Sequence, residues 1–145
     1  WHLWASCHPL ADPDEADQMV TDYATSANGL EWVWHGTVLT GRPGHWDARG
    51  ARVSAVLQHR GRTIAFYDGR ASAAENYEER TGLAAGQGYS MLLPQFDEPV
   101  GASPHPGGGL RYLDVLRIPG QGWRLYYEVT RADGAHELRT ELHPD

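Results

Sequence analysis

The stretch WHLWAS at residues 1–6 is the most informative guide to the fold, because it occurs twice more in similar form, as TIAFYD at 63–68 and WRLYYE at 123–128. The copies lie about 60 residues apart, and each places aromatic side chains on a short strand-like run. Self-similarity at a period of tens of residues is the signature of a repeat architecture. We therefore interpret the chain as copies of one structural unit.

Further predicted strands surround these aromatic runs. Each copy is followed by a polar loop and a second strand, at 21–25, 81–85 and 136–140. The second and third copies are preceded by an apolar run, at 51–57 and 110–116. Hairpin turns need residues that accept positive φ, and glycines lie between the paired runs. In the first copy an Asn-Gly turn then leads to an outer strand that ends near Leu39.

The predicted unit thus contains four antiparallel strands, which is how a β-propeller blade is built. The expected fold is all-β, a single domain forming a partial ring of about two and a half blades. We assign 1–40 to an incomplete blade, 41–100 to a full blade and 101–145 to the last blade. The Pro- and Gly-rich segment 94–109 is expected to connect two blades. A β-sandwich with similar strand spacing is the alternative.

Helical composition is confined to residues 12–19 and 71–80, which we expect in blade loops. The net charge of −7 repels phosphate backbones, so nucleic acid is not an expected partner. No apolar run approaches the roughly 20 residues of a membrane-spanning helix, and no signal segment precedes the first strand, so a soluble chain is expected. Cys7 is the only cysteine and cannot form an internal disulfide, which leaves the compartment open.

No cofactor or metal is expected. The eight histidines are scattered without the spacing of a zinc site. The glycine run 107–109 follows prolines and precedes no predicted helix, so it lacks the context of a phosphate-binding loop.

The segment YATSANGLEW at 23–32 and the strand ends FYD at 66–68 and YYE at 126–128 carry a family resemblance. They resemble the blades of five-bladed propeller glycoside hydrolases, the arabinanase, β-xylosidase and fructosidase group. The resemblance implies a carbohydrate ligand in a central channel. It also implies that the signature carboxylates lie in earlier blades, so we expect the chain to be incomplete and inactive alone. Its partners would then be missing blades or copies of itself, because exposed blade faces cost about 25 cal/mol per Å².

Glycoside hydrolysis needs two carboxyl groups on opposite sides of the sugar. Asp47 is the first catalytic candidate, since it precedes a predicted inner strand. Trp46 could stack on a sugar, and Arg49 and Arg52 could grip it. The alternative is a capped turn with surface charges.

The polar loop 67–80 supplies a second set of candidates. Asp68 is the second catalytic candidate, paired with Arg70 to orient a substrate hydroxyl, and Glu79 could close over the substrate. Solvated turns explain such charges equally well, above all for Glu75 and Glu78.

Three further residues are candidates for substrate binding. Strand alternation places Arg111 with Leu113 on one face and Tyr112 with Asp114 on the other. We include Arg111 and Asp114, because one of these faces should reach the channel. His8 could rim the sugar pocket.

Glu128 occupies the repeat position of Asp68 and Ser6, and we interpret this recurring polar residue as the end of a strand in each blade. The leading hypothesis for the whole chain is a glycoside-hydrolase-like propeller segment that acts on or binds carbohydrate. The alternatives are a non-catalytic carbohydrate-binding or scaffold propeller, and a structural β-domain that associates through exposed aromatic faces.

Overall fold

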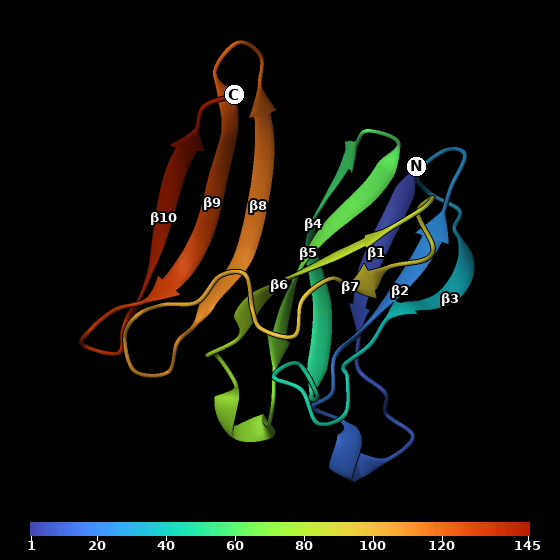
Figure 1. Cartoon of the computed structure of the whole chain (residues 1–145). Coiled ribbons are helices and arrows are strands. Elements are labelled where there is room, and N and C mark those ends of the chain that lie inside the picture. Colours follow the sequence, from blue (N-terminus) through green and yellow to red (C-terminus); the bar gives the residue numbers. More distant parts are fainter.

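The computed structural model describes residues 1–145 as a nearly all-β protein with three antiparallel sheets, which Figure 1 shows side by side. The strands are β1 (His2–Cys7), β2 (Val20–Thr25), β3 (Val33–Leu39), β4 (Gly50–His59), β5 (Arg62–Arg70), β6 (Arg80–Gly86), β7 (Leu93–Pro94), β8 (Leu110–Ile118), β9 (Gly122–Thr130) and β10 (His136–His143). No helix has the length and apolarity needed to cross a membrane.

The predicted four-stranded unit is present in the second sheet, whose strand order is β4-β5-β6-β7. The first sheet has the order β1-β2-β3, and the third has the order β10-β9-β8. The aromatic strands β1, β5 and β9 correspond to the three sequence copies. The all-β prediction of propeller-like blades is confirmed.

Helix is restricted to two short 3-10 turns, η1 (Pro13–Glu15) and η2 (Ala73–Glu75). Both lie in loops between the second and third strands of a blade, at the lower end of the sheets in Figure 1. Neither buries a side chain, so nothing apolar anchors a longer helix there. The segments of helical composition thus lie in blade loops, as expected, but they form single turns.

Neighbouring sheets are joined by a hydrogen bond that repeats from blade to blade. The Thr21 hydroxyl donates to the Ala51 carbonyl at 2.9 Å, and the equivalent Thr81 hydroxyl donates to the Leu110 carbonyl at 2.8 Å. Each bond runs from the third strand of one blade to the first strand of the next. Because Thr21 and Thr81 are fully buried, these hydroxyls need such partners.

The apolar core differs between the two sheet interfaces. Seven buried residues form the main cluster, to which Trp4 and Val38 of the first sheet add partly buried side chains. The main cluster consists of Leu39, Trp46, Ala51, Ala65, Tyr67, Ala84 and Leu92. The third sheet is packed more sparsely, because its cluster has only three buried members, Leu113, Tyr127 and Val129.

Candidate functional site

A cross-strand ion pair lies near the lower end of the second sheet. Arg52 on β4 is directly opposite Asp68 on β5, and its Nη2 lies 2.9 Å from the Asp68 carboxylate. The other Asp68 oxygen accepts the backbone N–H of Tyr112 from the third sheet at 3.0 Å. Asp68 is 0% exposed. Its buried carboxylate therefore connects the second and third sheets through its bonds to Arg52 and the Tyr112 N–H.

The same pair recurs in the third sheet. Arg111 on β8 is opposite Glu128 on β9, and the Arg111 Nε donates to the Glu128 carboxylate at 2.6 Å. The recurring polar residue was predicted to end a strand, and this prediction is wrong. Strands β5 and β9 continue to Arg70 and Thr130, and the carboxylate serves as the partner of an inner-strand arginine.

Glu79 links Arg111 of the third sheet to Arg70 of the second sheet. Its carboxylate lies 3.0 Å from Arg111 Nη1 and 3.4 Å from Arg70 Nη1. The Glu79 carbonyl accepts the N–H of Leu110, just as the Met19 carbonyl accepts the N–H of Ala51 one blade earlier. Glu79 and Met19 are each 3% exposed. Met19 shows that an apolar side chain can fill this position at the interface between the first and second sheets. Packing therefore does not require the charge of Glu79 at the interface between the second and third sheets.

Two tyrosines with left-handed backbone cover the arginines. Tyr112 has a φ of 55° and Tyr77 a φ of 74°. The Arg52 and Arg111 guanidinium carbons lie 4.4 and 4.8 Å from the centre of the Tyr112 ring, and Arg111 lies 5.5 Å from that of Tyr77. Tyr112 is 49% and Tyr77 62% exposed. Positive φ at bulky residues is strained and concentrates at functional sites.

Electrostatics distinguish Asp68 from the other carboxylates of the cluster. Burial raises the pKa of Asp68 to about 6, although Arg52 and the Tyr112 N–H favour its ionised form. The nearby Glu79 carboxylate raises the pKa of Asp68 further. A buried carboxyl with a pKa near neutrality beside a specific charge partner is typical of functional sites.

The structure brings together five of the expected site residues, namely Arg52, Asp68, Arg70, Glu79 and Arg111. Arg49 lies next to this cluster, since it shares the Asp17 carboxylate with Arg70. Sequence reasoning missed Tyr77 and Tyr112 as site residues. Their positive φ and their contacts with arginine arise from the fold, and no motif in the sequence predicts either feature.

Trp46 and Asp47 lie in the core instead. The Asp47 carboxylate is fully buried and accepts the Arg42 Nε through both oxygens, at 3.1 and 3.0 Å, and the Tyr67 hydroxyl at 2.8 Å. The Trp46 ring stacks on Tyr67 with centroids 5.8 Å apart. A Cβ at Gly69 would lie 2.8 Å from both Trp46 and Asp47, so this glycine permits their close approach. Neither side chain presents a free face to a ligand.

Asp114 and His8 lie apart from the cluster as well. Asp114 is exposed, and its carboxylate accepts the N–H of Val115. His8 is exposed in the loop that follows β1. Residues 111 to 114 alternate between buried and exposed as predicted, but a β-bulge interrupts the register there and turns the Tyr112 N–H toward Asp68.

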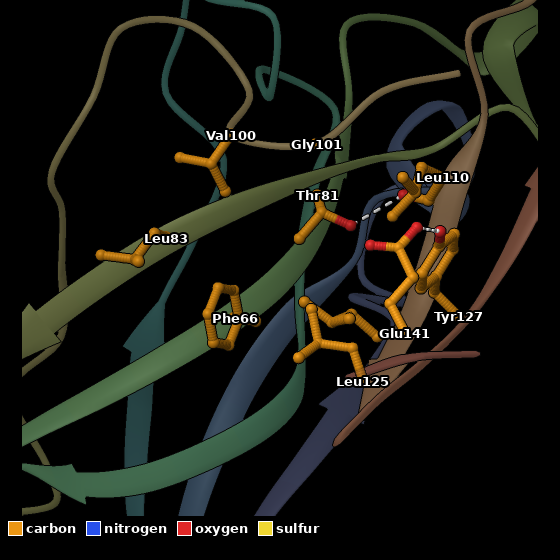
Figure 2. A pocket seen from close by; sticks show the side chains of 10 residues that line it. Phe66, Thr81, Leu83, Val100, Gly101, Leu110, Leu125, Tyr127 and Glu141 are labelled. Atoms are coloured by element: carbon orange, nitrogen blue, oxygen red, sulfur yellow. Dashed lines mark hydrogen bonds between the residues drawn. The ribbon is translucent and has the colours of Figure 1, made fainter. Parts of the chain in front are cut away.

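A cavity of about 320 Å³ opens elsewhere, between the second and third sheets (Figure 2). Its lining is mostly apolar, with Phe66, Leu83 and Leu125 among the contributors. At its edge the Tyr127 hydroxyl donates to the Glu141 carboxylate, as Figure 2 shows. This cavity reflects the sparse packing of the third sheet, and it contains none of the arginines of the polar cluster.

No family model and no curated protein matches this sequence. Solved structures do match. The chain is similar to a sucrose-6-phosphate hydrolase from Lactobacillus gasseri, with a TM-score of 0.69, 16% identity, and coverage of 99% of this chain and 29% of that one. It is also similar to a family 117 glycoside hydrolase from Zobellia galactanivorans, with a TM-score of 0.69, 15% identity, and coverage of 89% and 39%.

A third similar structure is the α-L-arabinanase of Penicillium chrysogenum in complex with arabinobiose. Its TM-score is 0.60 at 15% identity, and the match covers 99% of this chain and 41% of that one. The chain thus spans less than half the length of each of these proteins. The chain therefore has the fold of part of a glycoside hydrolase β-propeller.

Proposed function

We propose that this chain binds carbohydrate at the cluster formed by Arg52, Tyr77, Arg111 and Tyr112. The observation that carries the proposal is the pair of exposed tyrosine rings held over two buried or half-buried guanidinium groups. Exposed aromatic rings provide apolar faces for the C–H surfaces of a sugar, and guanidinium N–H groups donate to its oxygens. Strands β4 and β8 begin their blades, and the first strands of propeller blades surround the central channel.

The proposed role is binding, and the carboxylates of the cluster position the arginines. Asp68 and Asp47, the two catalytic candidates, are fully buried with their oxygens engaged. A carboxyl group that donates a proton to a glycosidic oxygen must touch it. We therefore assign Asp68 as a positioning residue and omit Asp47 from the proposed site. Hydrolysis by a longer or assembled protein would need carboxylates from outside this cluster.

Titration of the purified chain with a panel of neutral and acidic oligosaccharides, followed by NMR or calorimetry, tests this proposal. Tyr112→Ala and Tyr77→Ala should each weaken binding about tenfold or more, because each removes a stacking face. Tyr126→Ala is the matched control, since Tyr126 is an exposed tyrosine on β9 that contacts none of these arginines. Equal binding by all three variants would refute the assignment.

The same preparation tests whether the chain catalyses hydrolysis by itself. We expect no release of reducing sugar from any oligosaccharide of the panel, since neither Asp47 nor Asp68 is accessible. Any turnover by the purified chain would show that one of its carboxyl groups reaches the substrate and that a role limited to binding is wrong.

A second candidate function, association with further β-structure, is favoured by the outer edge of the third sheet. Strand β10 pairs with β9 on one side only. Its Leu138 is 76% exposed. An unpaired strand edge is a template for another strand, either of a second copy or of further blades.

A further inference from the structure

Two positively charged groups converge on a single ring at the proposed site. The guanidinium carbons of Arg52 and Arg111 lie 4.4 and 4.8 Å from the centroid of Tyr112. The two arginines come from the first strands of adjacent blades. Each guanidinium is already paired with a carboxylate, Arg52 with Asp68 and Arg111 with Glu128 and Glu79. A ligand at this ring would therefore bind the N–H groups that these ion pairs leave free.

Each guanidinium keeps one terminal nitrogen available to a ligand. Arg52 donates to Asp68 through Nε and Nη2, while Arg111 donates through Nε to Glu128 and through Nη1 to Glu79. Nη1 of Arg52 and Nη2 of Arg111 have no acceptor in the protein. Unlike the Arg70 Nε, which is buried and has no partner, both atoms are exposed to solvent. Both nitrogens are therefore solvent-accessible donors.

The carboxylates hold these donors in place from the protein interior. Asp68 and Glu79 are almost completely buried, and Asp68 is bonded to Arg52 while Glu79 is bonded to Arg111. Anchored guanidinium groups lose little side-chain freedom when a ligand binds, and their N–H geometry matches that of carboxylates and phosphates. Neutral hydroxyl groups would make weaker bonds to the same donors.

We propose that the ligand is an acidic sugar whose carboxylate or phosphate group binds Arg52 and Arg111 while its ring stacks on Tyr112. This inference rests on the proposed carbohydrate site and specifies its substrate class. The anion takes the two available nitrogens, and the stacked tyrosine supplies the apolar contact that a free inorganic anion lacks.

The experiment compares four classes of probe by calorimetry on the same chain. These are uronate oligosaccharides, sugar 6-phosphates, the neutral parent sugars, and the free anions acetate and inorganic phosphate. We expect one acidic class to bind at least about tenfold more tightly than its neutral parent, as charge-assisted hydrogen bonds require. The better of the two acidic classes identifies carboxylate or phosphate as the recognised group.

Arg52→Gln combined with Asp68→Asn provides the decisive variant, because it removes a charge pair without leaving a buried charge unpaired. It should abolish most of the preference for acidic over neutral sugar while the far-UV spectrum stays unchanged. Arg117→Gln is the matched control, since Arg117 also stacks on an aromatic ring, Trp123, at 5.2 Å but lies outside the site. The control should bind every probe as the unmodified chain does.

The possible failures separate the two proposals. Equal affinity for acidic and neutral sugars, both weakened by Tyr112→Ala, overturns the acidic class and leaves the carbohydrate site intact. Equal affinity for sugar phosphate and inorganic phosphate, insensitive to Tyr112→Ala, overturns the carbohydrate site and leaves an anion site. The absence of binding by any probe to the folded chain overturns both.

Discussion

Asp68 shows how a single buried carboxyl couples the stability of this protein to pH. Its pKa is 3.8 in its ordinary state, and burial raises the pKa to about 6 in the folded protein. Below about pH 4 the Asp68 carboxyl is protonated in both the folded and the unfolded chain. Between pH 4 and 6 the unfolded chain releases the proton and the folded chain retains it, so the stabilisation present at low pH is lost as the pH rises through 6.

Asp68→Asn should remove this dependence. Relative to the variant, the unmodified chain should lose on the order of 3 kcal/mol of unfolding free energy between pH 4 and pH 7, since one pKa unit corresponds to about 1.4 kcal/mol. Urea unfolding of both proteins at the two pH values measures the difference. Parallel pH profiles would mean that the pKa of Asp68 is the same in the folded and unfolded chains, which would contradict the raised value.

Glu78 should show the opposite pH dependence. Burial raises the pKa of Glu78, but hydrogen bonds from Thr130, His136 and the Gly109 N–H outweigh this effect and lower it. Its stabilisation is therefore present above its unfolded pKa and lost as the pH falls through the folded value. Glu78→Gln should accordingly be less stable than the unmodified chain at pH 7 and lose that deficit at low pH, as thermal melts at pH 7 and pH 3 would reveal.

Glu79 allows a test of whether its buried charge serves stability. Glu79→Met copies the side chain found at Met19 one blade earlier, but it leaves Arg70 and Arg111 without their shared carboxylate. Removing one partner of a buried pair typically costs about 3–5 kcal/mol, so we expect a destabilised protein. Chemical unfolding measures the cost, and a stability equal to that of the unmodified chain would show that the charge serves only binding.

Among the strands, the threonine hydrogen bond that repeats between blades should contribute to the free energy of unfolding at both sheet interfaces. The contribution at the first interface should be larger, because Thr21 makes one additional hydrogen bond. Thr81→Val removes a buried hydroxyl that donates to the Leu110 carbonyl at 2.8 Å, and should cost about 1 kcal/mol. Thr21→Val should cost more, because the Thr21 hydroxyl also accepts the N–H of Val53 at 3.0 Å. Equal losses in urea unfolding would show that the additional bond contributes nothing.

The close approach of β6 to the chain that follows it gives a sterically defined test. A Cβ at Gly86 would lie 1.6 Å from the Met91 carbonyl oxygen, whereas a Cβ at Gly101 would make contacts of 3.4 Å and longer. Gly86→Ala should therefore destabilise the second sheet by about 3 kcal/mol or more. This cost should be several times that of Gly101→Ala. Hydrogen exchange of the β6 amides in the two variants would show whether the loss is local.

At the scale of the whole molecule, the exposed edge of β10 predicts concentration-dependent association. Leu138 is exposed on this strand, whose outer edge pairs with nothing in the chain. Leu138→Lys should shift the equilibrium toward monomer, because an edge lysine opposes strand pairing. Light scattering after size exclusion, over a range of concentrations, measures the mass. A monomeric mass for both proteins at every concentration would contradict the proposed association.

Much of the strand pattern followed from sequence, because period and alternation are local properties of the chain. The copies at 1–6, 63–68 and 123–128 became β1, β5 and β9, and the loop segments 12–19 and 71–80 remained outside the strands except for Arg80, which begins β6. Arg52, Asp68 and Arg111 were identified as polar residues of inner or aromatic strands. Their cross-strand pairing depends on register, which is fixed only when both strands have found their positions in the sheet.

The repeat, the all-β class and the strands that carry the polar residues could be derived from the sequence alone. The burial of Asp47 against the Tyr67 hydroxyl, the link that Glu79 makes between two blades and the contact of Tyr112 with two arginines are visible only in three dimensions. The physical reason is distance along the chain. Hydrophobic periodicity acts between neighbouring residues, whereas burial, pKa and ring contacts arise between residues that meet only after the blades have packed together.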